Sequence, residues 1–261
     1  MAIKLIITLV LCLQAFTLYS QHGTLIIASI RPDGILIAAD SRGSMYKNND
    51  SHTPPIAYTD SLCKIYPFKQ FVIAIAGAYE LGNKFIYQIV DDFNKNSFYD
   101  KSLDNTIKAF EAFMDENYPV GLFPLRQLMV GIAAGYVNGR PQLSFTSVIR
   151  DSTMYEGTMS NDTAVYKYIK ANNNKNAGLT VGEVTENIFK DFIIGERKSN
   201  QVGGPITIFL INSLNQIGWA QNDFRSYEYT DVKSYIKDLK SGKKKVVYLT
   251  PTAKEIILKN F

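Results

Sequence analysis

Two apolar runs near the N-terminus, at residues 23–29 and 35–39, constrain the fold more than any other feature of the chain. Both runs are rich in aliphatic and β-branched residues, and the turn formers Pro32, Asp33 and Gly34 lie between them. Neither run alternates regularly between apolar and polar residues, which is typical of strands that are buried on both faces. The pattern therefore predicts a hairpin of two largely buried strands.

The remainder of the chain alternates between paired strands and paired helices. Paired hairpins separated by paired helices favour antiparallel sheets stacked face to face. We therefore expect an α+β fold of four layers, αββα, with helices flanking the two sheets. The polar residues 43–61 indicate a long loop. The expected strands form three pairs: 62–66 with 70–76, joined by a turn at 67–69; 128–137 with 142–149; and 206–212 with 216–221. The expected helices are 81–93, 102–118 with a cap at Ser102, 162–171 and 181–198.

The first twenty residues have a different character. Lys4 precedes an unbroken apolar run at residues 5–13, and a less apolar stretch follows, which is the order of a secretory signal peptide. The run is too short to span a bilayer. We expect a signal peptide at residues 1–20, cleaved after Ser20 or Gln21, and no membrane span once it is removed. The mature protein would then be exported by a bacterium, to the periplasm or the medium.

Composition excludes several classes of function. The 28 Lys and Arg residues nearly balance the 24 Asp and Glu residues, without a basic stripe, so we expect no nucleic-acid partner. The chain has two histidines, His22 in the segment that is expected to be removed and His52 in the polar loop. We therefore expect neither a Ser-His-Asp triad nor a multi-histidine metal site. No phosphate loop or dinucleotide fingerprint is present, and we expect neither cofactor nor metal. Cys63 is expected to be a small buried hydrophobe and not a nucleophile.

Four short motifs follow one another in the first third of the chain. Gly23-Thr24 opens the first strand, and the hairpin ends in Ala38-Ala39-Asp40-Ser41-Arg42. Lys64-Ile65 and Ala76-Gly77 come next. In this order the motifs resemble those of 20S proteasome β subunits, which are N-terminal nucleophile (Ntn) hydrolases. The resemblance implies an Ntn-hydrolase domain at residues 21–222, followed by a C-terminal extension at 223–261.

The resemblance implies catalytic roles for five residues. Thr24 would be the nucleophile, because its own α-amine can act as general base once the residues before it are removed. Lys64 would lower the pKa of the Thr24 hydroxyl, and Asp40 would hold the Lys64 ammonium in place. The backbone N–H of Gly77 would form the oxyanion hole, and Ser160 would complete the site.

The resemblance also identifies residues around the site. Arg42 would be a structural neighbour of the catalytic group. Leu62, Ile75 and Tyr79 would line the substrate pocket, which predicts a preference for a hydrophobic or small residue before the scissile bond. The substrate would be a peptide or protein, and the subunits would assemble into a homo-oligomeric ring.

The sequence departs from the family pattern at two places. Alignment on Gly203-Gly204 puts Ser199 and Val202 where the family has an Asp and a Ser that complete the site. Residues 43–61 form an insertion at the mouth of the site, where they could cap the cleft or interfere with ring packing. Both departures bear on activity more than on the fold.

Each candidate residue also has a plainer interpretation. Thr24 could be only the first β-branched residue of a strand, Asp40 and Arg42 could form a strand-end ion pair, and Lys64 could be a solvated strand residue. Two alternatives to a self-processing threonine peptidase therefore stay open. One is a catalytically inactive subunit that serves as a structural or binding component, and the other is an amidase for a small substrate.

Overall fold

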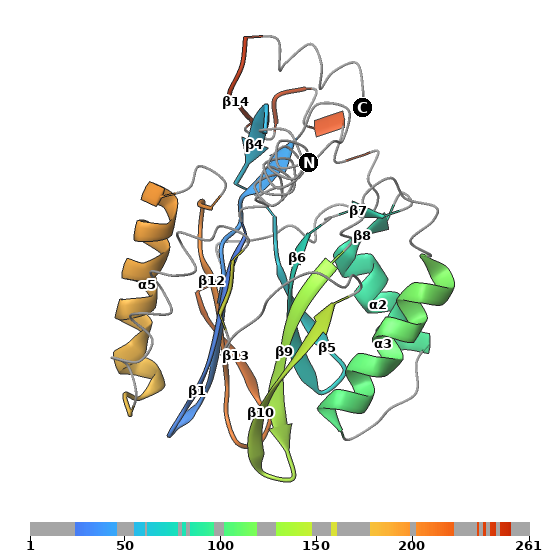
Figure 1. Cartoon of the computed structure of the whole chain (residues 1–261), viewed down its shortest axis with the longest axis vertical. Coiled ribbons are helices and arrows are strands. Elements are labelled where there is room, and N and C mark those ends of the chain that lie inside the picture. The colour runs from blue at the N-terminus through green and yellow to red at the C-terminus, as the bar shows by residue number, and fades with distance from the viewer. Residues whose placement is uncertain are drawn as a thin grey trace, which may run out of the picture.

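The computed structural model describes residues 24–45, 55–60, 62–77, 80–81, 84–96, 102–118, 129–147, 158–160, 178–198, 202–221 and 246–251, together with 234, 237–238 and 241–243. These residues form a mixed α and β fold with several antiparallel sheets and three helices whose bounds are described (Figure 1). The predicted helix at 162–171 lies outside the described residues, as does the signal peptide. No helix in the described ranges is long and apolar enough to cross a membrane.

The predicted N-terminal hairpin is confirmed as the centre of a five-stranded antiparallel sheet. In its register Ile26 lies opposite Ala39, so Thr24 and Asp40 lie together at the open end of the hairpin. One member of the sheet was not predicted, because a three-residue strand leaves no periodic signal. The strands, in sheet order, are β11 (Thr158–Ser160), β1 (Leu25–Arg31), β2 (Gly34–Ala39), β12 (Thr207–Ile211) and β13 (Ile217–Gln221).

A second sheet contains four antiparallel strands, in the order β10 (Arg140–Ser147), β9 (Met129–Val137), β6 (Phe71–Gly77) and β5 (Ile65–Phe68). Asn138 and Gly139 join β9 to β10 with φ angles of 51° and 74°. Two successive positive φ angles make the tight hairpin turn that the Asn-Gly pair predicts. The turn expected at residues 67–69 is wrong by about two positions, because Pro67 lies within β5. Proline is tolerated there because β5 is an edge strand.

The two sheets face each other, and helices cover their outer faces (Figure 1). Successive side chains of a strand point to opposite faces, and β1 buries both. Its residues Ile26 and Ala28 pack between the sheets, whereas Leu25 and Ile27 pack against helix α5 (Val181–Lys198). Helices α2 (Ile86–Asn96) and α3 (Leu103–Asn117) cover the far side of the four-stranded sheet.

The helix predictions were correct for α3 and α5 and partly wrong for α2. The Ser102 side chain caps α3 as predicted, by accepting a hydrogen bond from the backbone N–H of Asn105. Leu81 and Phe85, expected in a helix, belong to the short paired strands β7 (Glu80–Leu81) and β8 (Lys84–Phe85). Their spacing suits a helix, but Gly82 between them is a poor helix former.

The turn between β12 and β13 makes a polar link between the two sheets. Asn215 has a φ angle of 55°, and its side-chain amide is hydrogen-bonded to both backbone groups of Tyr136 in β9. Its Oδ1 accepts from the Tyr136 N–H at 2.6 Å, and its Nδ2 donates to the Tyr136 carbonyl at 2.8 Å. Tyr136 lies beside the β9–β10 turn, so this link is at the end of the sheets away from Thr24.

The loop expected at residues 43–61 is wrong at both of its ends. Those ends form the strands β3 (Gly43–Met45) and β4 (Ala57–Thr59), which pair with each other. A third strand from the C-terminal extension, β14 (Val247–Tyr248), pairs with the other edge of β4. The backbone N–H of Leu249 also donates to the Ile56 carbonyl at 2.7 Å. The extension therefore contacts the insertion directly.

Candidate active site

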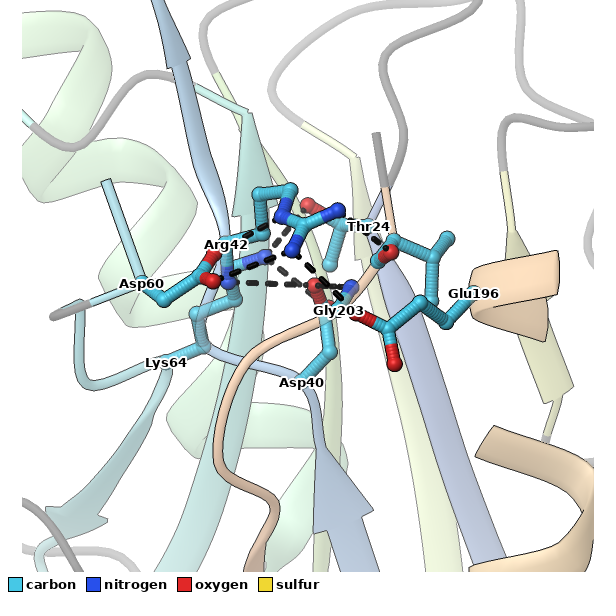
Figure 2. Close-up of polar contacts among 8 residues, drawn as sticks. Thr24, Asp40, Arg42, Asp60, Lys64, Glu196 and Gly203 are labelled. Carbon is cyan, nitrogen blue, oxygen red and sulfur yellow. Dashed lines mark hydrogen bonds and ion pairs between the residues drawn. The ribbon is translucent and has the colours of Figure 1, made fainter. Parts of the chain in front are cut away.

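Thr24, Asp40 and Lys64 meet at one end of the stacked sheets (Figure 2). The Lys64 ammonium lies 3.0 Å from the Thr24 hydroxyl oxygen and 2.9 Å from Asp40 Oδ1, and it donates a hydrogen bond to each. Thr24 directly precedes β1, Asp40 directly follows β2, and Lys64 directly precedes β5. The exposed fractions are 8% for Thr24, 1% for Asp40 and 7% for Lys64. Lys64 is therefore not a solvated strand residue.

The Asp40 carboxylate is fixed from both sides. Its Oδ1 accepts hydrogen bonds from Lys64 and from the backbone N–H of Leu25, the latter at 2.9 Å. Its Oδ2 accepts from the backbone N–H groups of Arg42 and Gly203, each at 3.2 Å. A carboxylate can accept about four hydrogen bonds, so these four donors occupy it fully. The carboxylate therefore holds the Lys64 ammonium in one position beside the Thr24 hydroxyl.

Burial perturbs the protonation of both charged groups. Removal from water lowers the pKa of the Lys64 ammonium below its ordinary value, and the ion pair with Asp40 opposes this. The same burial raises the pKa of the Asp40 carboxyl, against the attraction of Lys64 and the N–H groups of Leu25 and Gly203. Perturbed charges of this kind are common at functional sites.

The ion pairs described for the Arg42 guanidinium are with Asp60 and Glu196. Its Nε and Nη2 donate to the two carboxylate oxygens of Asp60, at 2.7 and 3.0 Å. Nη2 also donates to Glu196 at 3.2 Å, and Nη1 donates to the Val202 carbonyl at 3.2 Å. The ring of Tyr58 lies 3.9 Å from the guanidinium carbon, as in a cation–π contact. The backbone N–H of Arg42 donates to Asp40 Oδ2 at 3.2 Å.

Sequence reasoning missed Asp60, Tyr58 and Glu196, and it used Gly203 only as an alignment point. Gly203 is in fact part of the site, because its N–H is bonded to Asp40. A Cβ atom at this position would lie 2.6 Å from the Arg42 guanidinium carbon and 2.7 Å from a Glu196 oxygen. The position therefore requires glycine. The one feature of the sequence that could have predicted these partners is Arg42 itself. A basic residue close to the end of a buried strand needs an acidic partner.

The remaining predicted site residues lie around this group. Gly77 ends β6 with a φ angle of 119°, a conformation that glycine adopts more readily than other residues. Ser160 ends β11 and lies opposite Leu25 in the sheet, so its backbone is adjacent to the start of β1. Val202 contributes its carbonyl to the binding of Arg42. Ser199 lies outside the described residues.

The proposed pocket is described in part. Leu62 is half-buried, and its side chain covers Gly43 so closely that a Cβ atom there would lie 2.1 Å from Leu62 Cδ1. Ile75 is buried in the core cluster that includes residues of α2 and α3, and its N–H donates to the Lys64 carbonyl at 2.8 Å. Tyr79 lies outside the described residues. Within the described ranges, no group of three His, Cys, Asp or Glu side chains could hold a metal ion.

The threonine hydroxyl beside a buried lysine–aspartate pair, at the open end of the β1–β2 hairpin, is the arrangement that the resemblance of the sequence implies. No family model matches the chain, and a search of curated proteins finds no match. Among solved structures, the chain is similar to a mutant of Anbu from Hyphomicrobium sp. strain MC1, a bacterial proteasome-like protein with the Ntn-hydrolase fold. The TM-score is 0.54 at 14% identity, over 85% of this chain and 96% of the other. The likeness supports a relation at the level of the fold.

Proposed function

We propose that this protein is a threonine-type Ntn hydrolase with a four-layer αββα fold, which cleaves amide bonds in a peptide or protein substrate. One observation carries the proposal: the buried Lys64 ammonium lies 3.0 Å from the Thr24 hydroxyl while Asp40 holds it on the other side. The fold-level likeness to Anbu is consistent with a proteasome-like peptidase. An apolar pocket at Leu62 and Ile75 and assembly into a homo-oligomeric ring belong to the same proposal.

The reaction follows from the positions of these groups. Thr24 Oγ1 attacks the substrate carbonyl carbon, and its proton passes to the free α-amine of the same residue. The Lys64 charge stabilises the alkoxide that forms, and the N–H of Gly77 donates to the oxyanion of the tetrahedral intermediate. The intermediate expels the amine product, which takes the proton from the Thr24 ammonium. Water then hydrolyses the remaining ester and restores the Thr24 hydroxyl.

Activation requires that Thr24 become the N-terminal residue. Removal of the signal peptide after Ser20 or Gln21 would leave His22 and Gly23 ahead of it, so a second cleavage is needed. The Thr24 hydroxyl attacks the carbonyl of Gly23 and displaces its own amide nitrogen, which produces an ester and a free α-amine. Hydrolysis of that ester releases the preceding residues. Export of the protein to the periplasm or the medium is part of this proposal and rests on residues 1–20.

The test compares the purified wild-type protein with Thr24→Ala, by intact mass, N-terminal sequencing and hydrolysis of a panel of fluorogenic peptides. We expect the wild type to begin at Thr24 and to hydrolyse peptides after hydrophobic or small residues. Thr24→Ala should begin at Gln21 or His22 and be inactive, because it has no hydroxyl for either reaction.

Other outcomes separate the alternatives. A folded wild type that also begins at Gln21 or His22 has no amine base, and the inactive subunit is then the correct interpretation. If both proteins begin at residue 24, another protease removes the preceding residues. Hydrolysis of small amides without cleavage of any peptide would favour the amidase.

A further inference from the structure

The insertion at residues 43–61 holds Arg42 on two sides. Asp60, which directly follows β4, binds the edge of the Arg42 guanidinium with both carboxylate oxygens, at 2.7 and 3.0 Å. Tyr58, within β4, places its ring 3.9 Å from the guanidinium carbon. A bidentate carboxylate and an aromatic face together fix the plane of a guanidinium as well as its position. The insertion therefore determines where the Arg42 side chain lies.

Arg42 in turn is connected to the Asp40 carboxylate by two backbone routes. Its own N–H donates to Asp40 Oδ2 at 3.2 Å. Its guanidinium donates to the carbonyl of Val202, and the next residue, Gly203, donates its N–H to the same oxygen of Asp40. The guanidinium therefore holds the residue next to one of the two Oδ2 donors, and the Ser41 N–H also holds that donor, by donating to the Gly203 carbonyl at 3.2 Å. The other oxygen of Asp40 holds the Lys64 ammonium beside the Thr24 hydroxyl.

Burial and charge identify Asp60 as the main partner of Arg42. The Arg42 side chain is 7% exposed, so it needs a well-placed counter-ion. Asp60 is 33% exposed and makes two short contacts, whereas Glu196 is 52% exposed and makes one at 3.2 Å. An exposed carboxylate at that distance is largely screened by water. Glu196 alone is therefore a weak substitute for Asp60.

We propose that Asp60 is a positioning residue of the active site and that the insertion supports the Lys64–Asp40 pair through Arg42. This assigns a supporting role to the part of the insertion at Tyr58 and Asp60, and it rests on the proposed hydrolase function. The C-terminal extension contributes to the same support, because Val247 in β14 pairs with Tyr58 in β4. The hydrogen bonds of Asp60 go to Arg42, and its charge also opposes the lowering of the Lys64 pKa that burial causes.

The first measurement is the kinetics of Asp60→Asn. The neutral amide leaves the buried guanidinium short of a counter-ion, so we expect kcat to fall by about 10- to 100-fold, as for other residues that orient a catalytic group. KM should stay within about twofold, because Asp60 does not bind substrate. Asp60→Glu keeps the charge and should give an intermediate kcat. Asp92→Asn is the matched control, since Asp92 is 31% exposed and pairs with Lys84 at 2.6 Å outside the site.

The second measurement does not depend on activity. Amide hydrogen exchange of the full-length mature protein should show about tenfold faster exchange at Arg42 and Gly203 in Asp60→Asn, because both hydrogen bonds to Asp40 weaken. Exchange at Ile132, in the centre of the four-stranded sheet, should stay as in the wild type. Asp92→Asn should leave all three amides unchanged.

The outcomes distinguish this proposal from the proposed function. An active protein in which Asp60→Asn has the wild-type kcat overturns the positioning role, whatever the exchange rates show, and leaves the hydrolase function intact. A wild type without hydrolytic activity overturns the function, and unchanged exchange at Arg42 and Gly203 then overturns the positioning role as well. If Asp60→Asn does not fold, Asp60→Glu replaces it, and a wild-type kcat in that variant overturns the proposal.

Discussion

Lys64 and Arg42 are both buried basic residues that donate a hydrogen bond to the Asp40 carboxylate, but the partners of their charged groups differ in exposure. The Lys64 ammonium is paired with a carboxylate whose side chain is 0% exposed. The Arg42 guanidinium is paired with Asp60 and Glu196, which both remain in contact with water. Removing both members of a pair from water costs more free energy than removing one. The Lys64–Asp40 pair therefore contributes little to the free energy of folding. The Arg42 cluster instead joins the segments that carry Asp60, Glu196 and Val202.

Lys64→Met should show the largest loss of stability. The substitution keeps the length of the side chain but leaves Asp40 buried without a counter-ion, which typically costs about 3–5 kcal/mol. Urea denaturation at neutral pH measures the free energy of unfolding. Adding Asp40→Asn to Lys64→Met removes the unpaired charge and should recover part of that loss without restoring hydrolysis. A single variant as stable as the wild type would mean that Asp40 is protonated in the folded protein.

Arg42→Met should have a smaller effect, about 1–3 kcal/mol. Asp60 and Glu196 can be hydrated when the guanidinium is removed, so neither is left as a buried unpaired charge. The loss comes mainly from the hydrogen bond to the Val202 carbonyl and from contact with Tyr58. The same denaturation experiment measures it. A loss as large as that of Lys64→Met would remove the distinction between the two cations.

Glu196→Gln should have the smallest effect, roughly 0.2–1 kcal/mol, because an exposed ion pair is weakened by solvent. The difference from wild type should shrink further between low and high salt, as screening increases. Denaturation at two salt concentrations tests this. A loss above about 2 kcal/mol would identify Glu196 as the main partner of Arg42 and would argue against the role given to Asp60.

The sequence was most informative where the structure is local. The β1–β2 hairpin is specified by its own residues and turn, so its position and the meeting of Thr24 with Asp40 could be predicted. The partners of Arg42 could not, because Asp60 and Glu196 lie 18 and 154 residues away along the chain. No periodicity within either segment encodes which distant charge it will contact. Lys64 was placed by resemblance to a family and not by its own neighbourhood.

Short strands account for most of the errors in the predicted fold. The strands β3, β4, β11 and β14 have three residues or fewer, which is too short for an alternating pattern to be recognised. Two of these pairings join segments that are far apart in sequence, namely β11 with β1 and β14 with β4. Such pairing is decided by tertiary packing, which overrides local preference. The site was therefore predictable as a set of residues but not as a supported structure.

The Asn215 link to Tyr136 has a mechanical consequence for the site. Thr24 and Asp40 flank strands of the five-stranded sheet, while Lys64 precedes a strand of the four-stranded sheet, so this group of side chains joins the two sheets. The hydrogen bonds between Asn215 and Tyr136 join the two sheets at the opposite end. Any rotation of one sheet against the other about this pivot would be magnified along the length of the strands. A turn residue that is far from Thr24 and Lys64 therefore restrains the two sheets whose other ends carry them.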